Sequence, residues 1–334
     1  MMIFVGCYTN KDNPNGLKTL RLDASTGELE LAGEYSLSNA LYQTLSSDGR
    51  FLYSCTGEGI ASFSIEADGN LKEVDSVPLG DCICHVAELP ELGRVAFAEY
   101  LGGFAGSVAV KDGYFSNLKK HQHHGGGPNL PRQESAHCHQ ACKLPGEAGY
   151  VVCDLGSDEI VEYPRNRVFK TTPRGAGPRH LLFHPNGRLA FLVSELGNIV
   201  SSLAWTVEKG FTLIDSRSTL GNDFSGLNLA AAIRFTPDNK RVVVSNRGEN
   251  SLAVFDFDEN TGKLTFKSRT MLDGNWPRDF IFVTDSLALV ALEKSGEIHS
   301  LKYDLQTGSF TLLQKCRGLF RPVGLNRVWA RQLP

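Results

Sequence analysis

The feature of this sequence that most constrains its fold is an internal repeat. Each unit has two apolar segments joined by a turn that contains Asp, Asn or Gly, followed by a loop and a second pair of apolar segments joined by another turn. Six copies lie at residues 45–71, 89–115, 144–169, 183–211, 235–264 and 282–310, and residues 1–29 form a seventh copy that lacks its first segment. A repeat of this kind forms one structural unit per copy, and each unit needs its neighbours to bury its apolar surface.

The segments of each unit have the pattern of β-strands. Apolar and polar residues alternate, as in residues 251–255, and the turns carry Asp-Gly, Asn-Gly or Thr-Gly pairs that suit hairpins. No part of the sequence has the periodicity of a long helix. Four short strands per copy, at spacings of roughly 40 to 55 residues, are typical of propeller blades. We therefore predict an all-β, seven-bladed β-propeller of four-stranded antiparallel blades, in one domain over residues 1–334.

The incomplete first copy predicts how the ring closes. Residues 321–326, with the sequence RPVGLN, resemble the first strands of other copies, such as residues 178–181. We expect this C-terminal segment to be the innermost strand of the blade that residues 2–8 begin, which leaves the ring no open edge. Two stacked β-sandwiches are the alternative, but they do not account for the displaced strand.

Composition excludes several classes of protein. Apolar residues make up 41% and charged residues 21% of the chain, as in globular proteins with a large core. The formal net charge of −3 argues against a nucleic-acid binder with a basic surface. No segment approaches the roughly 18 apolar residues of a membrane span. We expect no nucleic-acid or membrane partner.

Cysteine usage and the N-terminus predict a cytoplasmic protein. Eight cysteines are too few for a disulfide scaffold in a chain of this length, and there is no CxxC pair. Cys7, Cys55 and Cys153 lie in apolar segments, where a thiol behaves as a small apolar group. Residues 1–9 have neither a basic region nor a cleavage site of small residues, and we predict a strand there.

Charged residues gather where the propeller topology brings strand ends together. The starts of the first strands and the ends of the second strands meet on one face of the central channel. The first-strand starts carry Cys84, His85, His137, Cys138, His139, Arg179, His180, Arg278 and Arg321. The second-strand ends carry Tyr8, Glu99, Tyr100, Asp154, Glu195, Asn246, Arg247 and Glu293. They predict a polar, partly enclosed site, and the alternative is a hydrated channel whose charges serve only solubility.

Three of these side chains suit the binding of an anion and the transfer of a proton. Arg179 follows Gly177 and Pro178, and its guanidinium could form a bidentate pair with a phosphate or carboxylate. Glu195 follows an apolar strand and could act as a base beside the arginines. Arg247 occupies the equivalent place one blade later. A structural ion pair between Glu195 and Arg247 is the main alternative.

Histidines offer further candidates. His137 and His139 alternate along a strand, so they share a face; either could act as an acid or base near neutral pH, and a structural role or metal binding are the alternatives. The cluster of His121, His123 and His124 precedes Gly125–Gly127 in a polar stretch, for which we predict a mobile, solvated loop. No Walker loop, Rossmann fingerprint, nucleophile elbow or HExxH motif occurs, so no cofactor or metal is expected.

The chain resembles the seven-bladed-propeller lactonase family, which includes bacterial cytoplasmic 6-phosphogluconolactonases and fungal carboxy-cis,cis-muconate cyclases. The resemblance covers nearly the whole chain and depends on the order of several short motifs. They are GCYT at residues 6–9, SAHCH at 135–139, DLGSD at 154–158, GPRHL at 177–181, FHPNG at 183–187, SEL at 194–196 and SNRG at 245–248. One departure is Asp279 after Arg278, where a small residue is expected and where a carboxylate could alter how an anion is held.

The resemblance implies residue roles and a reaction. In the cyclase branch the residues proposed for chemistry match His139 (or His137), Arg179, Glu195 and Arg247. His137, His85, Arg278 and Asp154 are then candidates for substrate binding. The leading hypothesis is hydrolysis of an anionic sugar lactone, above all 6-phosphogluconolactone, without metal or cofactor. Cyclisation of a carboxymuconate and a non-catalytic scaffold that binds a protein partner are the alternatives.

Overall fold

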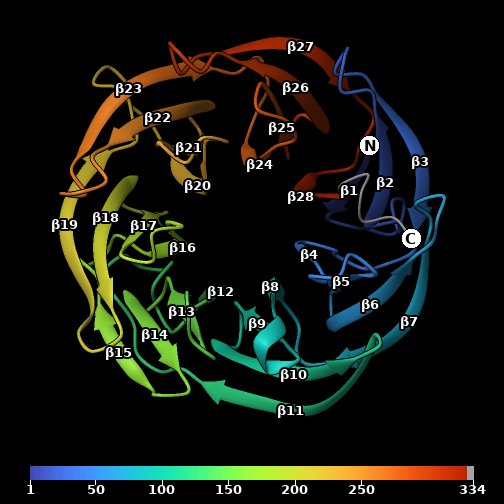
Figure 1. Ribbon diagram of the computed structural model, residues 1–334, viewed down its shortest axis with the longest axis horizontal. Coiled ribbons are helices and arrows are strands. Elements are labelled where there is room, and N and C mark those ends of the chain that lie inside the picture. The colour runs from blue at the N-terminus through green and yellow to red at the C-terminus, as the bar shows by residue number, and fades with distance from the viewer. Residues whose placement is uncertain (329–334) are drawn as a thin grey trace.

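The computed structural model describes residues 1–328 and confirms the predicted propeller. Seven four-stranded antiparallel sheets are arranged as blades around a common centre (Figure 1). In six blades the strand nearest the centre pairs with the next strand along the chain, and the fourth strand lies on the outer rim; in the remaining blade the innermost strand comes from the C-terminal end of the described chain and pairs with the first strand. Residues 329–334 of the predicted domain lie outside the described residues.

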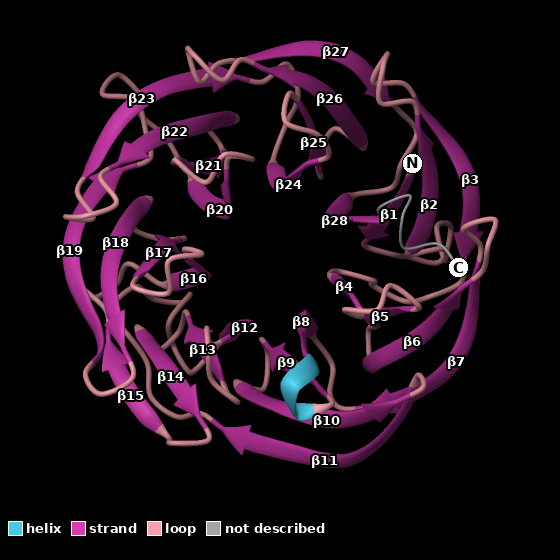
Figure 2. Ribbon diagram, viewed as in Figure 1, coloured by secondary structure: helices cyan, strands magenta, loops and turns pink. Residues whose placement is uncertain are grey.

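The blades are numbered here in chain order from the first complete one. Blade 1 has β4 (Gln43–Leu45), β5 (Phe51–Cys55), β6 (Gly59–Ile65) and β7 (Leu71–Pro78). Blade 2 has β8 (Ile83–Leu89), β9 (Arg94–Glu99), β10 (Phe104–Lys111) and β11 (Tyr114–Gln122), with a short 3₁₀ helix at Pro90–Leu92 (Figure 2). Blade 3 has β12 (Cys138–Lys143), β13 (Tyr150–Asp154), β14 (Glu159–Tyr163) and β15 (Arg167–Lys170). Blade 4 has β16 (Pro178–Phe183), β17 (Leu189–Ser194), β18 (Ile199–Thr206) and β19 (Gly210–Ser218).

The remaining blades complete the ring. Blade 5 has β20 (Leu229–Phe235), β21 (Arg241–Arg247), β22 (Ser251–Phe257) and β23 (Leu264–Met271). Blade 6 has β24 (Pro277–Phe282), β25 (Leu287–Leu292), β26 (Glu297–Tyr303) and β27 (Phe310–Cys316). Blade 7 combines β28 (Pro322–Val328) with β1 (Met2–Cys7), β2 (Leu17–Leu22) and β3 (Leu29–Tyr35).

Blade 7 closes the ring as the sequence predicts. β28 pairs antiparallel with β1, so that Leu325 lies opposite Val5 and residues from the two ends of the chain share one sheet (Figure 1). The pairing extends two residues beyond the predicted segment, to Val328. At Gly6 the backbone of β1 passes so close to blade 1 that a Cβ atom would lie 1.8 Å from the carbonyl oxygen of Ala40, and only glycine fits there.

Apolar clusters between adjacent blades form the core. One such cluster joins Ile3 and Leu20 of blade 7 to Leu289 and Ile298 of blade 6, and all four side chains are buried. Each strand presents one face to each neighbouring blade, which explains why the second strands are buried over nearly their whole length. The ring is therefore held by the packing of blade against blade, and it needs every blade in place.

A β-bulge recurs near the start of the first strands. The pairing of first and second strands skips one residue in five blades, and the skipped residues are Cys84, His139, Arg179, Arg278 and Val323. A bulge leaves the extra residue unpaired and re-aims its side chain. All five of these residues line the cavities at the ring centre. The bulge thus supplies one side chain to the channel from each of these five blades.

Two further expectations concern the chain as a whole. All eight cysteines are free thiols, and Cys7, Cys55 and Cys153 are buried as expected. Across residues 1–328, no helix has the length and apolar character needed to cross a membrane.

Ring closure predicts an uneven response to two leucine truncations in blade 7. Leu325→Ala removes a side chain that is 3% exposed and packs between blades 6 and 7, so we expect a loss of about 2–5 kcal/mol in the free energy of unfolding. Leu31→Ala, on the outer strand β3 of the same sheet and 55% exposed, is the control and should change it by less than about 0.5 kcal/mol. Urea unfolding measures both, and equal effects would contradict the closure.

Candidate active site

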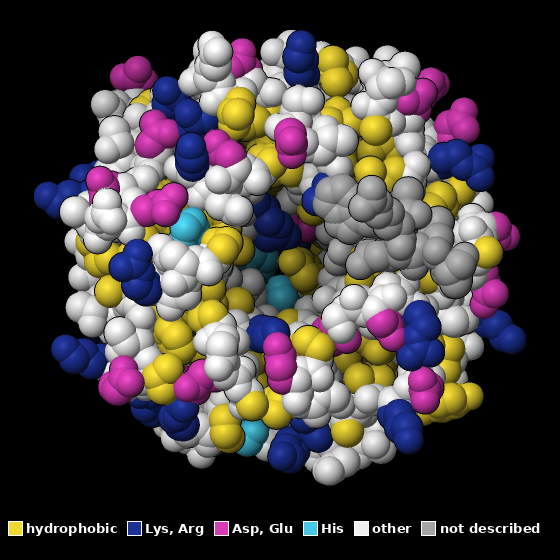
Figure 3. Space-filling model, in the orientation of Figure 1, with side chains coloured by type: hydrophobic (Ala, Val, Ile, Leu, Met, Phe, Trp, Pro, Cys, Tyr) yellow, Lys and Arg dark blue, Asp and Glu magenta, His cyan; other side chains and the backbone are white. Residues whose placement is uncertain are grey.

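A cavity of about 420 Å³ opens at the centre of the ring. Basic and histidine side chains are visible inside the central hollow in Figure 3. Nine lining residues come from the two kinds of strand end that the sequence singles out. Tyr8, Tyr100, Glu195, Arg247 and Glu293 lie at second-strand ends, and Cys84, His139, Arg278 and Arg321 lie at first-strand starts. The propeller topology therefore brings together residues from both ends and the middle of the chain.

The cavity wall carries an excess of positive charge. Five basic side chains line it against two carboxylates, those of Glu195 and Glu293. The basic residues are Arg132, Arg247, Arg278, Lys294 and Arg321. A concave site lined mainly by one sign of charge concentrates ligands of the opposite sign. The wall also includes the rings of Tyr8, Tyr100 and Trp276, which suit the apolar faces of a small organic molecule.

Glu195 is the centre of the inner part of the site. It follows β17, and its side chain is 3% exposed. One carboxylate oxygen, Oε2, lies 2.9 Å from Nε of Arg179 and 2.5 Å from Nη2 of Arg247. The other, Oε1, lies 2.7 Å from Nη2 of Arg132, which also donates a hydrogen bond of 3.0 Å to the hydroxyl of Tyr100. Three guanidinium groups thus share one buried carboxylate.

The electrostatics keep Glu195 ionised. Burial by itself would raise the pKa of Glu195, but the charges of Arg247, Arg179 and Arg132 together hold this pKa well below its usual value. A carboxylate with so low a pKa accepts a proton poorly. The geometry therefore suits Glu195 as the counter-ion that holds the arginines in place.

His139 is the neutral member of this group. Its ring packs edge-on against Tyr100, and its Nε2 lies 3.9 Å from Oε2 of Glu195. Burial, together with the charge of Arg179, holds the pKa of His139 well below its usual value, so the ring is uncharged at neutral pH. Its Nδ1 is buried without a hydrogen-bond partner among residues 1–328. His139 can therefore accept a proton in a cavity that is otherwise cationic.

Arg179, unlike Arg132, Arg247, Arg278 and Arg321, does not line the main cavity. It lines a small void below the main cavity, and its Nη1 donates a 2.6 Å hydrogen bond to the carbonyl of Ala231. Burial and the charge of Arg247 lower the pKa of Arg179 to about 9, so it remains protonated at neutral pH. Asp279 borders the same void and pairs with Arg234 at 2.7 Å. This carboxylate is thus neutralised below the cavity, away from its wall.

Three other predicted site residues do not reach the cavity wall. His85 lies deeper in the channel, where its ring stacks on Tyr42 at 4.0 Å. His137 stacks behind Tyr100 at 4.5 Å, and its Nδ1 donates a 2.7 Å hydrogen bond to the carbonyl of that residue. Asp154 is fully buried beside them, and one of its oxygens accepts hydrogen bonds from the backbone N–H of His137, Gly156 and Ser157.

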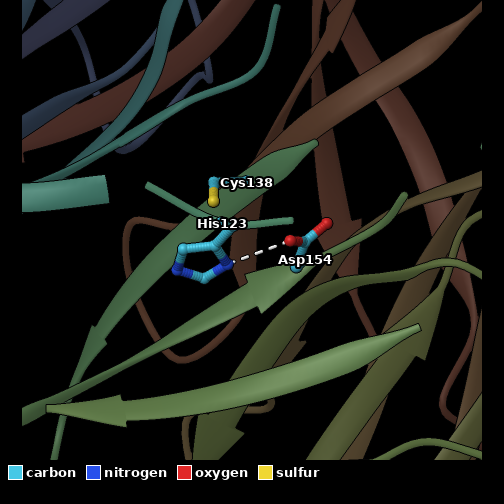
Figure 4. A group of neighbouring side chains, drawn as sticks. All are labelled: His123, Cys138 and Asp154. Carbon is cyan, nitrogen blue, oxygen red and sulfur yellow. Dashed lines mark hydrogen bonds and ion pairs between the residues drawn. The ribbon is translucent and has the colours of Figure 1, made fainter. Parts of the chain in front are cut away.

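The prediction of a mobile, solvated loop at the histidine cluster is wrong for two of its members. His123 is buried and donates from Nδ1 to Asp154 at 2.9 Å (Figure 4). Its Nε2 accepts a hydrogen bond of 2.8 Å from the hydroxyl of Tyr163. His121 ends up in β11, stacked on the ring of Tyr163 at 4.2 Å. Hydrogen bonds to Asp154 and Tyr163, which are distant in the sequence, hold this segment in place, and the spacing of residues in the sequence does not reveal these partners. His124 is exposed as expected.

This cluster also contains donor atoms that could hold a metal ion. Atoms of His123, Cys138 and Asp154 lie within 4.8 Å of one another, and Figure 4 shows the three side chains together. Hydrogen bonds already engage both nitrogens of His123 and both oxygens of Asp154. They order the start of the loop between β11 and β12, and that loop carries Arg132 to the cavity.

Sequence reasoning missed three basic or aromatic residues of the wall. Arg132 comes from the long loop before β12, and Trp276 and Lys294 come from the connections that flank β24 and β25. The ammonium group of Lys294 lies over the Trp276 ring at 3.2 Å. Trp276 and Lys294 adjoin strand ends that the sequence analysis did consider, whereas nothing in the pattern marks Arg132.

A second acidic residue organises the outer part of the cavity. Glu293 follows β25 and pairs with Arg278 at 3.3 Å and with Arg321 at 2.5 Å. Both guanidinium groups also lie over the ring of Tyr8, at 5.4 and 4.2 Å from its centroid. This group mixes residues from the two ends of the chain, and it depends on the closure of blade 7.

Fold and cavity together define a class of protein: a β-propeller with a cationic cavity at the centre of its ring. The family model described as "Lactonase, 7-bladed beta-propeller" matches residues 2–324. The chain belongs to this lactonase family.

The relatives of this chain match it along nearly its whole length. It is 32% identical to a 6-phosphogluconolactonase of Bacillus subtilis, over 96% of both chains, and 34% identical to an uncharacterized protein of Lactococcus lactis, over 94% of this chain and 95% of that one. Among solved structures, a periplasmic gluconolactonase of Pseudomonas aeruginosa superposes with a TM-score of 0.90 at 26% identity and covers 97% of this chain and 98% of that one.

Buried histidines predict a loss of stability in mild acid. Burial lowers the pKa of His85, His139 and His180 well below the ordinary value of 6.5. Below pH 6.5 these histidines bind protons in the unfolded chain but not in the folded chain, so the free energy of unfolding is greatest above this pH and falls as the pH drops. Each histidine should lower the free energy of unfolding by about 1.4 kcal/mol for each pH unit below about 6.5.

Urea unfolding at about pH 7.5 and about pH 5.5 measures this loss, and one substitution isolates a single histidine. The phenylalanine of His85→Phe keeps the stack on Tyr42 but cannot be protonated. Between the two pH values the free energy of unfolding of this variant should therefore decrease by about 1.4 kcal/mol less than that of the wild type. His124→Asn, at an exposed position, is the control and should lose as much as the wild type. An unchanged loss in His85→Phe would contradict a neutral buried His85.

Proposed function

We propose that this protein hydrolyses an anionic sugar lactone, and that 6-phosphogluconolactone is its substrate. The observation that carries the proposal is the cavity itself, where five basic side chains surround a neutral histidine that lies beside an ionised carboxylate. The family and the 6-phosphogluconolactonase of Bacillus subtilis support lactone hydrolysis. A phosphorylated lactone supplies the negative charge that this wall is suited to bind.

Hydrolysis of a lactone needs an activated water molecule. In the proposed reaction His139 takes a proton from water as the oxygen attacks the lactone carbonyl, because its ring is uncharged whereas guanidinium groups occupy both oxygens of Glu195. Glu195, held by its arginines, stabilises the imidazolium that forms 3.9 Å away. His139 then returns the proton to the ring oxygen as the carbon–oxygen bond of the ester breaks. The product is an open-chain acid.

The arginines stabilise the negative charge that develops on the carbonyl oxygen. Arg247 lines the cavity and is the guanidinium group placed to act as the oxyanion donor. Arg179 lies below it and positions Glu195 through the 2.9 Å ion pair. A sugar lactone hydrolyses readily in water, so the protein needs to supply only a modest part of the barrier.

Cyclisation of a carboxymuconate is the second candidate. The observation that favours it is that His139, Arg179, Glu195 and Arg247, which match the residues proposed for chemistry in the cyclase branch, lie together. There the arginines would bind carboxylates and a proton would be transferred to carbon. The two candidates are separated by an assay that measures turnover of several lactones and of a carboxymuconate, with the spontaneous reaction subtracted. If the protein turns over none of these compounds, a binding scaffold is favoured.

We propose the cytoplasm as the site of this activity. The eight free cysteines suit a reducing compartment. Export of the protein with its activity intact would contradict this assignment.

Replacement of His139 predicts a specific loss of turnover. His139→Asn removes the proton acceptor with little change in volume, and we expect kcat for 6-phosphogluconolactone to fall by about 10²-fold or more while substrate still binds. In the wild type, kcat/KM should decline as the pH falls through the lowered pKa of His139, because the protonated ring cannot act as a base. The variant should lack this decline.

The matched control is His124→Asn, which changes an exposed histidine of the loop and should leave kcat and the pH profile unaltered. Acid release followed near neutral pH provides the measurement. A His139→Asn enzyme with wild-type kcat and a weaker KM would reassign this histidine to substrate binding.

A further inference from the structure

The outer part of the cavity repeats the construction of the inner part. Glu293 follows the second strand of blade 6, as Glu195 follows that of blade 4. Arg278 is the bulge residue of the same blade, as Arg179 is in blade 4. The following blade supplies a second arginine in each case, here Arg321. The cavity therefore contains two carboxylates, each shared by arginines of adjacent blades.

The two clusters differ in chemistry. His139 is the one histidine on the cavity wall within residues 1–328, and it belongs to the inner cluster. The outer cluster combines Arg278, Arg321 and Glu293, and its carboxylate is held by two guanidinium groups. It offers no neutral group that could take a proton from water. It can bind an anion, but it lacks the means to carry out the reaction.

The charge of the outer cluster matches a phosphate ester. Besides the two arginines, Lys294 lies on this part of the wall over Trp276, and in the described chain no carboxylate lies within ion-pair distance of it. Three cations against one carboxylate leave two positive charges, and a phosphate monoester carries about −1.5 to −2 near neutral pH. The arginine side chains here are also more exposed, 18% for Arg278 and 48% for Arg321 against 4% for Arg247. A strongly hydrated dianion can therefore enter without losing all contact with water.

Backbone conformation marks the same place independently. Of the ten non-glycine residues with positive φ in the described chain, eight are Asn or Asp, which tolerate that region. The other two are Trp276, with φ of 70°, and Arg321, with φ of 47°. Both precede a proline and both line the cavity: Arg321 belongs to the outer cluster, and the Trp276 ring lies between Lys294 and the guanidinium of Arg247. Strained residues of this kind are kept where the surrounding structure fixes a functional side chain.

We propose that Arg278, Arg321 and Lys294 form a subsite for the phosphate group of a phosphorylated lactone, which directs the ester carbonyl toward His139. This rests on the proposed lactonase function. The two clusters share one cavity, so a single molecule with its phosphate at one end and its ester at the other engages both. Glu293 holds the two arginines apart and oriented until the phosphate arrives. The subsite sets the preference for a phosphorylated over an unphosphorylated lactone.

The test compares two substrates that differ only in the phosphate, 6-phosphogluconolactone and glucono-δ-lactone. The quantity measured is the ratio of their kcat/KM values. Arg321→Gln removes a charge-assisted contact of the kind worth about 1.5–3 kcal/mol, so we expect this ratio to fall by roughly 10- to 100-fold. Lys294→Gln, at an exposed position, should lower the ratio in the same direction and guards against a folding defect in the first variant.

The matched control is Arg317→Gln, an exposed arginine paired with Glu297 that does not line the cavity, and it should leave the ratio unchanged. An unchanged ratio in both Arg321→Gln and Lys294→Gln would overturn the subsite. So would an equal loss on both substrates. A collapse of the ratio in Arg247→Lys alone would place the phosphate in the inner cluster.

Binding of inorganic phosphate, measured by calorimetry without any substrate, separates this proposal from the proposed function. We expect the wild type to bind phosphate, and Arg321→Gln to bind it at least about 10-fold more weakly. If the wild type hydrolyses neither lactone but shows this difference, the function fails and the anion subsite stands. If hydrolysis is found and phosphate binds both proteins equally, the subsite fails and the function stands.

Discussion

The buried carboxylate of Glu195 is the interaction on which the rest of the site depends. It neutralises Arg179 of its own blade, Arg247 of the next blade and Arg132 of a distant loop, and all three contacts are 2.9 Å or shorter. Without this carboxylate two nearly buried arginines would face each other with no counter-ion, a far more costly arrangement than an exposed charge. The same group lies 3.9 Å from His139, so the ion-pair network that fixes the arginines also sets the surroundings of the proposed base.

Closure of the ring serves the site as well as the fold. Tyr8 follows the first strand of the chain and Arg321 precedes the last, yet the backbone N–H of Tyr8 donates to the carbonyl of Arg321 at 3.1 Å, and the guanidinium stacks on the tyrosine ring. The outer cluster therefore exists only when β28 has joined β1. Because each blade needs its neighbours to bury its apolar faces, stability and the assembly of the cavity are coupled.

The centre of the ring places neutral histidines beside charged groups. His139 and Tyr100 share the wall of the main cavity with arginines and carboxylates, while His85 and His180 contact the ring of Tyr42 and His180 also contacts His139. Burial keeps these histidines neutral, since the nearby arginines already supply the positive charge that the carboxylates can balance. An uncharged proton acceptor can thus persist in a cationic cavity, as the proposed hydrolysis of an anionic ester requires.

The sequence by itself determined the blades, the closure and the strand ends that meet at the centre. The turn residues and the alternation of apolar and polar residues specify the strands, and the strand missing from the N-terminal copy but present near the C-terminus specifies how the ring closes. It did not determine which histidine faces the cavity. The bulge after Cys138 places His139 on the wall and leaves His137 behind Tyr100, and a shift of one residue in pairing exchanges the two faces of a strand. Nor did it reveal the burial of His123 or the approach of Arg132. These depend on Asp154, Tyr163 and Glu195, partners that only the packing of one blade against the next brings within hydrogen-bond distance.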